Sequence, residues 1–164
     1  MKITKLFMLI LIGFSISFSA CEEDNTYWDD LKQAEIDARE AYIKDYEEKN
    51  DTTLTPTASG LYYIETEEGT GVQAEAGKTV VVHYEGQLLT GTVFDSSWDR
   101  GSPIEFTLGQ GEVIAGWDEG IAYMKEGGRA MLIIPSDLAY GVQGSGSIPP
   151  YSTLVFYVQL IDVK

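Results

Sequence analysis

Beyond residue 59 the sequence alternates short β-type runs with glycine-containing turns, and this pattern constrains the fold more than any other feature. Within one run, Val80, Val82 and Tyr84 are separated by single residues and therefore fall on one side of an extended chain. Such alternation is typical of antiparallel strands with one buried face. A single stretch, residues 114–124, instead places its apolar residues at helical spacing. Many strands and one short amphipathic helix predict an α+β domain in which a sheet wraps over that helix.

Composition excludes several classes of function. The length of 164 residues suits one domain of about 100–150 residues with a small addition. Acidic residues outnumber basic ones by 26 to 11, so nucleic acid is not expected as a partner, because phosphate binding requires clustered Lys and Arg. One Cys and one His exclude an intrachain disulfide and are too few for a usual zinc site. No phosphate-binding loop or nucleophile motif occurs, and neither metal nor cofactor is expected.

Residues 1–20 are predicted to be a secretory signal peptide. Lys2 and Lys5 precede an apolar run of about 13 residues, shorter than the roughly 20 that span a bilayer as a helix. Cys21, the only cysteine, follows two small residues in a junction that resembles the lipobox of bacterial lipoproteins. In that class the signal is cut before the cysteine and its thiol is lipidated. We therefore expect a lipid anchor at Cys21, and a plain signal peptide that leaves a free thiol is the alternative.

The acidic residues directly after the cysteine bear on location. Glu22, Glu23 and Asp24 resemble the surface-export signal of Bacteroidetes-type lipoproteins, but short acidic runs also occur in ordinary solvated leaders. The expected location is the outer membrane, as a lipoprotein that faces the periplasm or the cell surface. The sequence leaves the choice between these two sides open.

A helix is predicted over residues 26–50, which contain neither Gly nor Pro. Thr26 and Asp29 fit a capping box in which Asp replaces Glu. The apolar residues do not form a clean stripe, and barely three heptads are too few for a sustained coiled coil. We interpret the helix as a solvated spacer, with a dimerising or domain-docking helix as the alternative. The predicted segments are a signal peptide (1–20), a lipidated leader with helical spacer and threonine-rich linker (21–59), and the globular domain (60–164).

Five motifs in the globular part occur in the order and near the spacing of a known family. They are VHYEG, FDSS, GEVIAGWDEG, PSDLAYG and the IPP–TLVF end, and together they resemble the FKBP-type peptidyl-prolyl cis–trans isomerases over residues 58–164. The resemblance implies a twisted antiparallel β-sheet curled around one short α-helix, in agreement with the strand pattern. It also implies faster rotation of X-Pro bonds in folding proteins. The expected partners are proline-containing polypeptides and the macrolide inhibitors of that family.

The resemblance also implies a proline pocket. Trp117 would form its floor, and Phe94 and Phe156 its sides. The backbone N–H of Ile114 and the hydroxyl of Tyr140 would donate to substrate carbonyls. The other carried-over positions are Tyr84 and Asp95 among the catalytic residues, and Arg100, Ile104, Val113 and Ile148 among those that bind substrate.

Three departures from the family pattern affect this pocket. Ile104 stands where a rim aromatic is common, Gly111 precedes Glu112 at a tight turn, and the loop over residues 141–149 is about one residue short. We expect these departures to act on substrate preference and macrolide affinity.

His83 is the only imidazole in the chain and alternates with Tyr84 along a predicted strand. Successive strand side chains face opposite sides, so if Tyr84 faces the pocket, His83 has a structural role. Without the resemblance, the acids Asp95, Asp99 and Glu105 are interpreted as scattered surface residues rather than a glycosidase pair. A non-enzymatic peptide-binding module or holdase that uses the same pocket is the alternative function.

Overall fold

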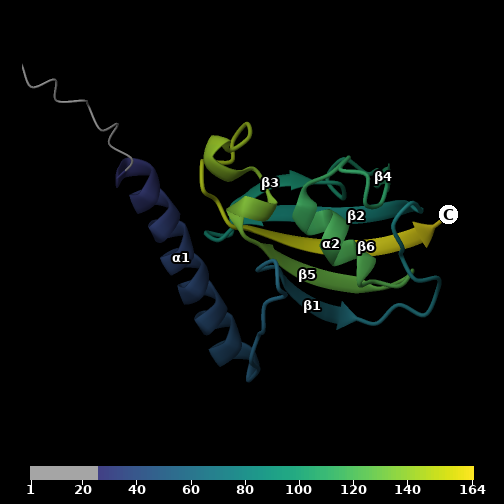
Figure 1. The fold of residues 1–164 in the computed structure, drawn as a ribbon. Helices are drawn as coiled ribbons and strands as arrows, with labels where there is room; N and C mark the ends of the chain where they lie inside the picture. Colours follow the sequence, from purple (N-terminus) through teal and green to yellow (C-terminus); the bar gives the residue numbers. More distant parts are fainter. Residues whose placement is uncertain (1–25) are drawn as a thin grey trace, which may run out of the picture.

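The computed structural model of the chain describes residues 26–164. The predicted signal peptide, the lipidation site Cys21 and the acidic leader lie outside the described residues. Within residues 26–164, no helix is both long and apolar enough to cross a bilayer. The described elements are α1 (Thr26–Asn50), β1 (Tyr62–Glu67), β2 (Thr79–Leu88), β3 (Val93–Ser96), β4 (Ile104–Thr107), α2 (Ala115–Ala122), β5 (Arg129–Ile134), the short 3-10 helices η1 (Ser136–Leu138) and η2 (Gly141–Gln143), and β6 (Leu154–Val163) (Figure 1).

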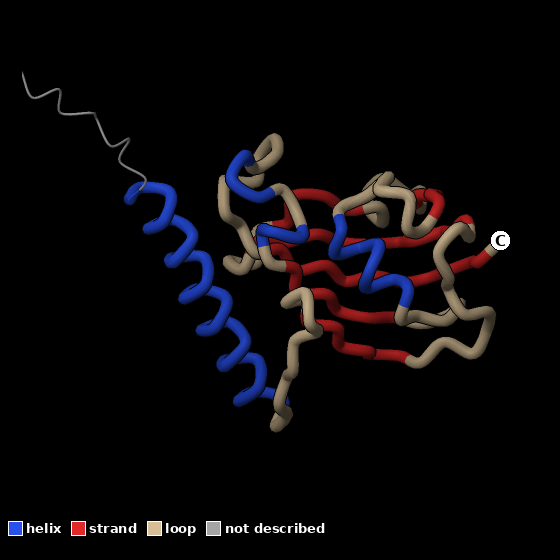
Figure 2. The backbone as a smooth tube through the Cα atoms, in the orientation of Figure 1, coloured by secondary structure: helices blue, strands red, loops and turns tan. Residues whose placement is uncertain are grey.

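The strands form one antiparallel sheet in the order β1-β5-β6-β2-β3, and β4 pairs with the far part of β2. Figures 1 and 2 show α2 lying across one face of this sheet, while α1 stands at one end of it. The predicted α+β fold, an antiparallel sheet around one short helix preceded by an N-terminal helix, is therefore confirmed. Its core contains the inward side chains of β2, β5 and β6 together with those of α2.

Helix α2 lies close against the sheet because glycines occupy its inner face. A Cβ atom at Gly116 would lie 2.4 Å from a methyl carbon of Ile134, and one at Gly120 would lie 2.8 Å from a methyl carbon of Leu132. Any larger residue at these positions would push the helix away from the sheet. The close approach buries Trp117, of which only 3% is exposed.

Helix α1 packs on the opposite face of the sheet. Ile43 is 7% exposed and lies in a second apolar cluster with Met131, Ile133 and Val155. These strand residues alternate with the core residues that α2 covers. The solvated-spacer interpretation is therefore wrong for this face of the helix, and the domain-docking alternative describes it. The apolar pattern of the sequence did not predict this docking, because polar side chains supply part of the face of α1 that packs on the domain.

We expect replacement of Ile43 by Ala to lower the free energy of unfolding by about 2–4 kcal/mol, because it removes buried methyl groups from a filled interface. The matched control is Ile36→Ala on the same helix, at a half-buried residue outside the apolar cluster, with a loss of roughly 1 kcal/mol or less. Urea unfolding of both variants measures the difference. Equal losses would show that α1 is not docked through Ile43.

Candidate active site

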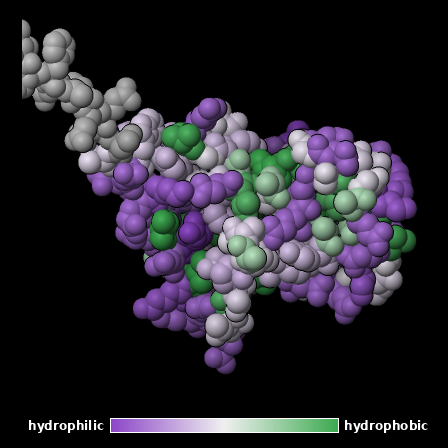
Figure 3. Space-filling model, in the orientation of Figure 1, coloured by the Kyte–Doolittle hydropathy of each residue, from purple (hydrophilic) through white to green (hydrophobic). Residues whose placement is uncertain are grey.

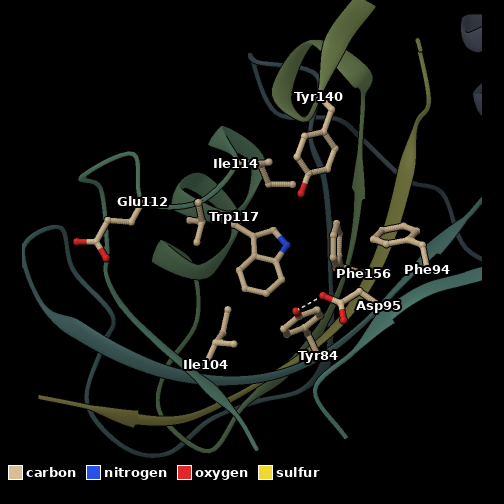
Figure 4. A pocket seen from close by; sticks show the side chains of 10 residues that line it. Tyr84, Phe94, Asp95, Ile104, Glu112, Ile114, Trp117, Tyr140 and Phe156 are labelled. Atoms are coloured by element: carbon tan, nitrogen blue, oxygen red, sulfur yellow. Dashed lines mark hydrogen bonds between the residues drawn. The ribbon is translucent and has the colours of Figure 1, made fainter. Parts of the chain in front are cut away.

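A cavity of about 190 Å³ opens beside the start of α2, the scale of a single side chain rather than of a whole peptide. Figure 3 shows hydrophobic surface gathered over the start of α2 and surrounded by hydrophilic residues. Strands β2, β3, β4 and β6 supply the sheet side of the cavity, and the loops before α2 and after η1 supply its rim. The lining residues are Tyr84, Phe94, Asp95, Ile104, Glu112, Val113, Ile114, Trp117, Tyr140 and Phe156 (Figure 4).

Aromatic rings packed edge to face make the floor and one side. The Trp117 ring lies 4.9 Å from that of Tyr84 at 81°, and 5.2 Å from that of Phe156 at 84°. Phe94 meets Phe156 at 5.6 Å and 83°. Each such pair adds about 0.5–1.5 kcal/mol beyond the burial of its area. Because every ring supports a neighbour, the apolar wall is held in one arrangement before any ligand binds.

Gly86 in β2 allows the rings of Phe94 and Phe156 to contact each other. It pairs with Asp95 of β3 on one side and with Phe156 of β6 on the other. A Cβ atom at Gly86 would lie 2.6 Å from the Phe94 ring and 2.7 Å from the Phe156 ring. The absence of a side chain here lets both rings lie over the strand.

A polar edge borders the aromatic wall. The Tyr84 hydroxyl donates a hydrogen bond to Asp95, and the Arg100 guanidinium donates to the other oxygen of Asp95 and, at 2.8 Å, to the Tyr84 hydroxyl. The Arg100 Cζ atom also lies 5.5 Å from the centre of the Tyr84 ring. The Asp95–Arg100 pair is about half exposed and adds little stability. Its effect is geometric, because it aims the carboxylate along the edge of the cavity.

Burial, followed by the hydrogen bond to Asp95, raises the pKa of the Tyr84 hydroxyl above its ordinary value. A phenol is protonated at neutral pH even without this shift, so Tyr84 donates to the carboxylate.

One rim is the loop that leads into α2. The Asp118 carboxylate accepts hydrogen bonds from the backbone N–H groups of Gly109, at 2.8 Å, and Gly111, at 3.0 Å. Both glycines have positive φ, +76° and +69°, which a side chain would disfavour. The tight loop brings Ile114 to the residue before the helix, where its carbonyl accepts from the Trp117 N–H at 2.9 Å.

The other rim carries Tyr140, which lies between η1 and η2 and is 39% exposed. Figure 4 shows its hydroxyl pointing into the cavity, opposite the Tyr84–Asp95 pair. Beyond it, Ser145 and Ile148 exchange backbone hydrogen bonds of 3.0 and 2.8 Å, and Tyr151 N–H donates to the Gly141 carbonyl at 2.9 Å. These bonds close the 141–151 loop on itself.

The structure brings together all seven residues predicted to be catalytic, and Ile104 and Val113 with them. Arg100 lies just outside the lining and acts on it through its hydrogen bonds to Asp95 and Tyr84. Ile148, predicted to bind substrate, is 8% exposed, belongs to the core cluster and is not among the described lining residues. Its side chain supports the loop from beneath.

Glu112 lines the cavity and was not predicted, because in so acidic a chain one more exposed Glu carries no distinguishing signal. Its carboxylate accepts a hydrogen bond from the Thr107 N–H at 3.3 Å. His83 lies outside the cavity lining, with Nδ1 2.8 Å from the Ser97 hydroxyl and its ring stacked on Trp98 at 5.5 Å. The side chain thus faces away from the site, as strand alternation requires.

Comparison with known proteins assigns this arrangement to a family. Residues 71–161 match the family model described as FKBP-type peptidyl-prolyl cis-trans isomerase, and this stretch holds every residue that lines the cavity. The chain belongs to the FKBP-type peptidyl-prolyl cis–trans isomerases. The predicted enzyme class is thereby confirmed.

Relatives in this family differ in how much of the chain they share. An FK506-binding protein of Neisseria meningitidis serogroup B is 52% identical over 105 residues, which are 63% of this chain and 96% of that protein. FkpA of Escherichia coli K12 is 46% identical over 127 residues, 76% of this chain and 46% of that protein. The crystal structure of E. coli FkpA superposes with a TM-score of 0.69 at 42% identity, covering 85% of this chain and 65% of that one.

The Gly86 contact leads to a prediction about the shape of this FKBP pocket. Gly86→Ala forces the Phe94 and Phe156 rings apart, and overpacking of this kind costs about 1–3 kcal/mol of stability. We expect kcat/KM for X-Pro peptides to fall while the variant stays folded. Ile43→Ala serves as the stability-matched control, because its side chain lies on the opposite face of the sheet. A folded Gly86→Ala variant with wild-type kinetics would show that the contact between Phe94 and Phe156 does not shape the site.

Proposed function

We propose that this cavity binds the proline ring of X-Pro segments and accelerates their cis–trans rotation in polypeptides that fold outside the cytoplasm. The observation that carries the proposal is the buried aromatic floor of Trp117, Tyr84 and Phe156 beside one oriented carboxylate, Asp95. A flat apolar floor suits a ring without polar atoms. The polar edge suits the peptide groups on either side of it.

The chemistry requires no nucleophile or proton transfer. Rotation of a peptide bond faces a barrier of about 18–20 kcal/mol, because resonance between nitrogen and carbonyl gives the bond partial double-bond character. The planar state is the more dipolar one and is favoured by water. The twisted transition state loses the resonance and part of that charge separation. An aromatic wall that excludes water from one side of the bond therefore favours the twisted state relative to the planar state.

Polar groups at the rim would hold the flanking chain while the bond rotates. The Tyr140 hydroxyl points into the cavity, and Ile114 lies beside it on the same side (Figure 4). Asp95 lies across the cavity from them, already bound to Tyr84 and Arg100. Contacts of this kind reduce the barrier when they fit the rotating carbonyl better than the planar one.

We expect Tyr140→Phe to lower kcat/KM about three- to tenfold, since a neutral hydrogen bond contributes roughly 0.5–1.5 kcal/mol. Asp95→Ala should also lower it, because Tyr84 and Arg100 lose their shared acceptor. His83→Ala should leave it near the wild-type value. A protease-coupled assay on X-Pro peptides measures all three, with circular dichroism to verify folding. Loss of turnover in a folded His83→Ala variant would contradict the mechanism.

The same floor and side rings are proposed to receive FK506-like macrolides, because the N. meningitidis relatives that share 52–53% identity bear the name FK506-binding protein. Competition between FK506 and an X-Pro peptide for the wild-type enzyme tests this. Inhibition that is lost in Trp117→Ala but retained in His83→Ala would place the macrolide in this cavity.

Location outside the cytoplasm and attachment to a membrane through lipid on Cys21 are part of the proposal. The support is the short basic-then-apolar leader that ends at the only cysteine. We expect the mature protein to partition into detergent, and Cys21→Ser to release it or to leave the signal uncut. Cell fractionation and labelling with a radioactive fatty acid measure this. Unchanged processing and membrane attachment in Cys21→Ser would contradict the anchor.

A further inference from the structure

Helix α1 contributes a buried carboxylate to the isomerase domain. Glu35 is 6% exposed, although it belongs to the N-terminal helix. It accepts hydrogen bonds from the backbone N–H of Ser136 at 2.7 Å, the hydroxyl of Ser136 at 2.7 Å and the hydroxyl of Thr153 at 2.8 Å. Arg39, one turn along the helix, donates a fourth bond at 3.2 Å. Three of these four bonds come from groups more than 100 residues away in sequence.

Ser136 and Thr153, which both donate to Glu35, lie at the two ends of one segment between strands. Residues 136–153, here called the rim segment, leave the sheet after β5 and return to it at β6. The segment carries Tyr140 above the cavity and Ile148 in the core beneath the loop. Because Ser136 begins the segment and Thr153 ends it, a single side chain on α1 holds both of its ends.

Other residues on the same face of α1 also contact the rim segment. Lys32 forms an ion pair with Asp137 at 3.0 Å, and the Trp28 ring lies 6.3 Å from that of Tyr151. Trp28, Lys32, Glu35 and Arg39 are spaced so that they share one side of a helix. The Lys32 pair is exposed and adds little on its own. Glu35 is the member of this face that is both buried and bonded to both ends of the segment.

Stability alone does not account for a carboxylate in this position. Desolvation of a buried charge is costly, and an apolar side chain that fills the same space is often neutral or more stabilising. A carboxylate differs from such a side chain in that it accepts several directional hydrogen bonds at once. Directional bonds to both ends of a loop specify where that loop stands.

We propose that Glu35 is a positioning residue for the isomerase site, which sets the Tyr140 hydroxyl over the cavity by holding the two ends of the rim segment. The inference rests on the role proposed above for Tyr140. It makes α1 a part of the active-site architecture rather than a tether. Helix α1 affects the substrate only through the rim segment.

Three single variants of the full mature chain test the proposal. Glu35→Ala removes all four bonds, and we expect kcat/KM to fall about three- to tenfold, as for loss of the Tyr140 hydroxyl. Glu35→Gln should recover most of the activity, because its amide oxygen can accept from the Ser136 N–H while its amide nitrogen donates to the Ser136 hydroxyl. Ile43→Ala loosens α1 without touching the rim segment and should keep wild-type kinetics despite its lower stability.

A double-mutant cycle separates positioning from general weakening. If Glu35 acts through Tyr140, Glu35→Ala should cost less than about twofold in a Tyr140→Phe background, because the two changes remove the same contact. If Glu35→Ala does not fold, Thr153→Val, which removes one donor at the end of the segment, takes its place in the cycle. Wild-type kinetics in the folded variant, or multiplicative losses in the cycle, would overturn the proposal. A wild-type enzyme without isomerase activity would instead overturn the proposed function.

Discussion

The close contact between helix α2 and the sheet is the constraint on which the site depends. Gly116 and Gly120 leave no room for a side chain against Ile134 and Leu132, so the helix backbone lies close to the strands. This distance lets the indole of Trp117, on the same helix, meet the rings of Tyr84 and Phe156 from the sheet. A helix held one methyl group further out would leave the floor of the cavity without its support.

The cavity combines this rigid apolar floor with a small polar edge, and Tyr84 belongs to both. Rings from β2 and β6 pack on the indole, and Phe94 of β3 packs on Phe156. The Tyr84–Asp95–Arg100 group lies where β2, β3 and the following loop meet. Hydrogen bonds among Tyr84, Asp95 and Arg100 hold one another in place, so the edge acts as a fixed set of donors and acceptors. Fixed groups suit a reaction in which a bond rotates and no bond breaks.

Periodicity and motifs predicted the strands, the short helix and the residues of the floor, because these depend on local spacing and on a few large side chains. The role of α1 was mispredicted for a physical reason. Its docking face mixes Ile43 with Lys32, Glu35 and Arg39, so burial there is achieved by hydrogen bonds as well as by apolar contact, and no apolar stripe marks it. Glu112 was missed and Ile148 misplaced because loop geometry, rather than residue type, decides which side chain reaches the cavity.

The central claim is that rotation is accelerated by an apolar, preformed wall and that no group gives or takes a proton. The most direct test is kcat/KM of the wild-type enzyme on one X-Pro peptide, measured in H₂O and D₂O across the pH range in which the enzyme stays folded. The account predicts equal values in the two solvents and a flat pH profile between about pH 5 and 8. A clear slowing in D₂O, or a fall of about tenfold or more across that range, would indicate general acid–base catalysis and contradict the account.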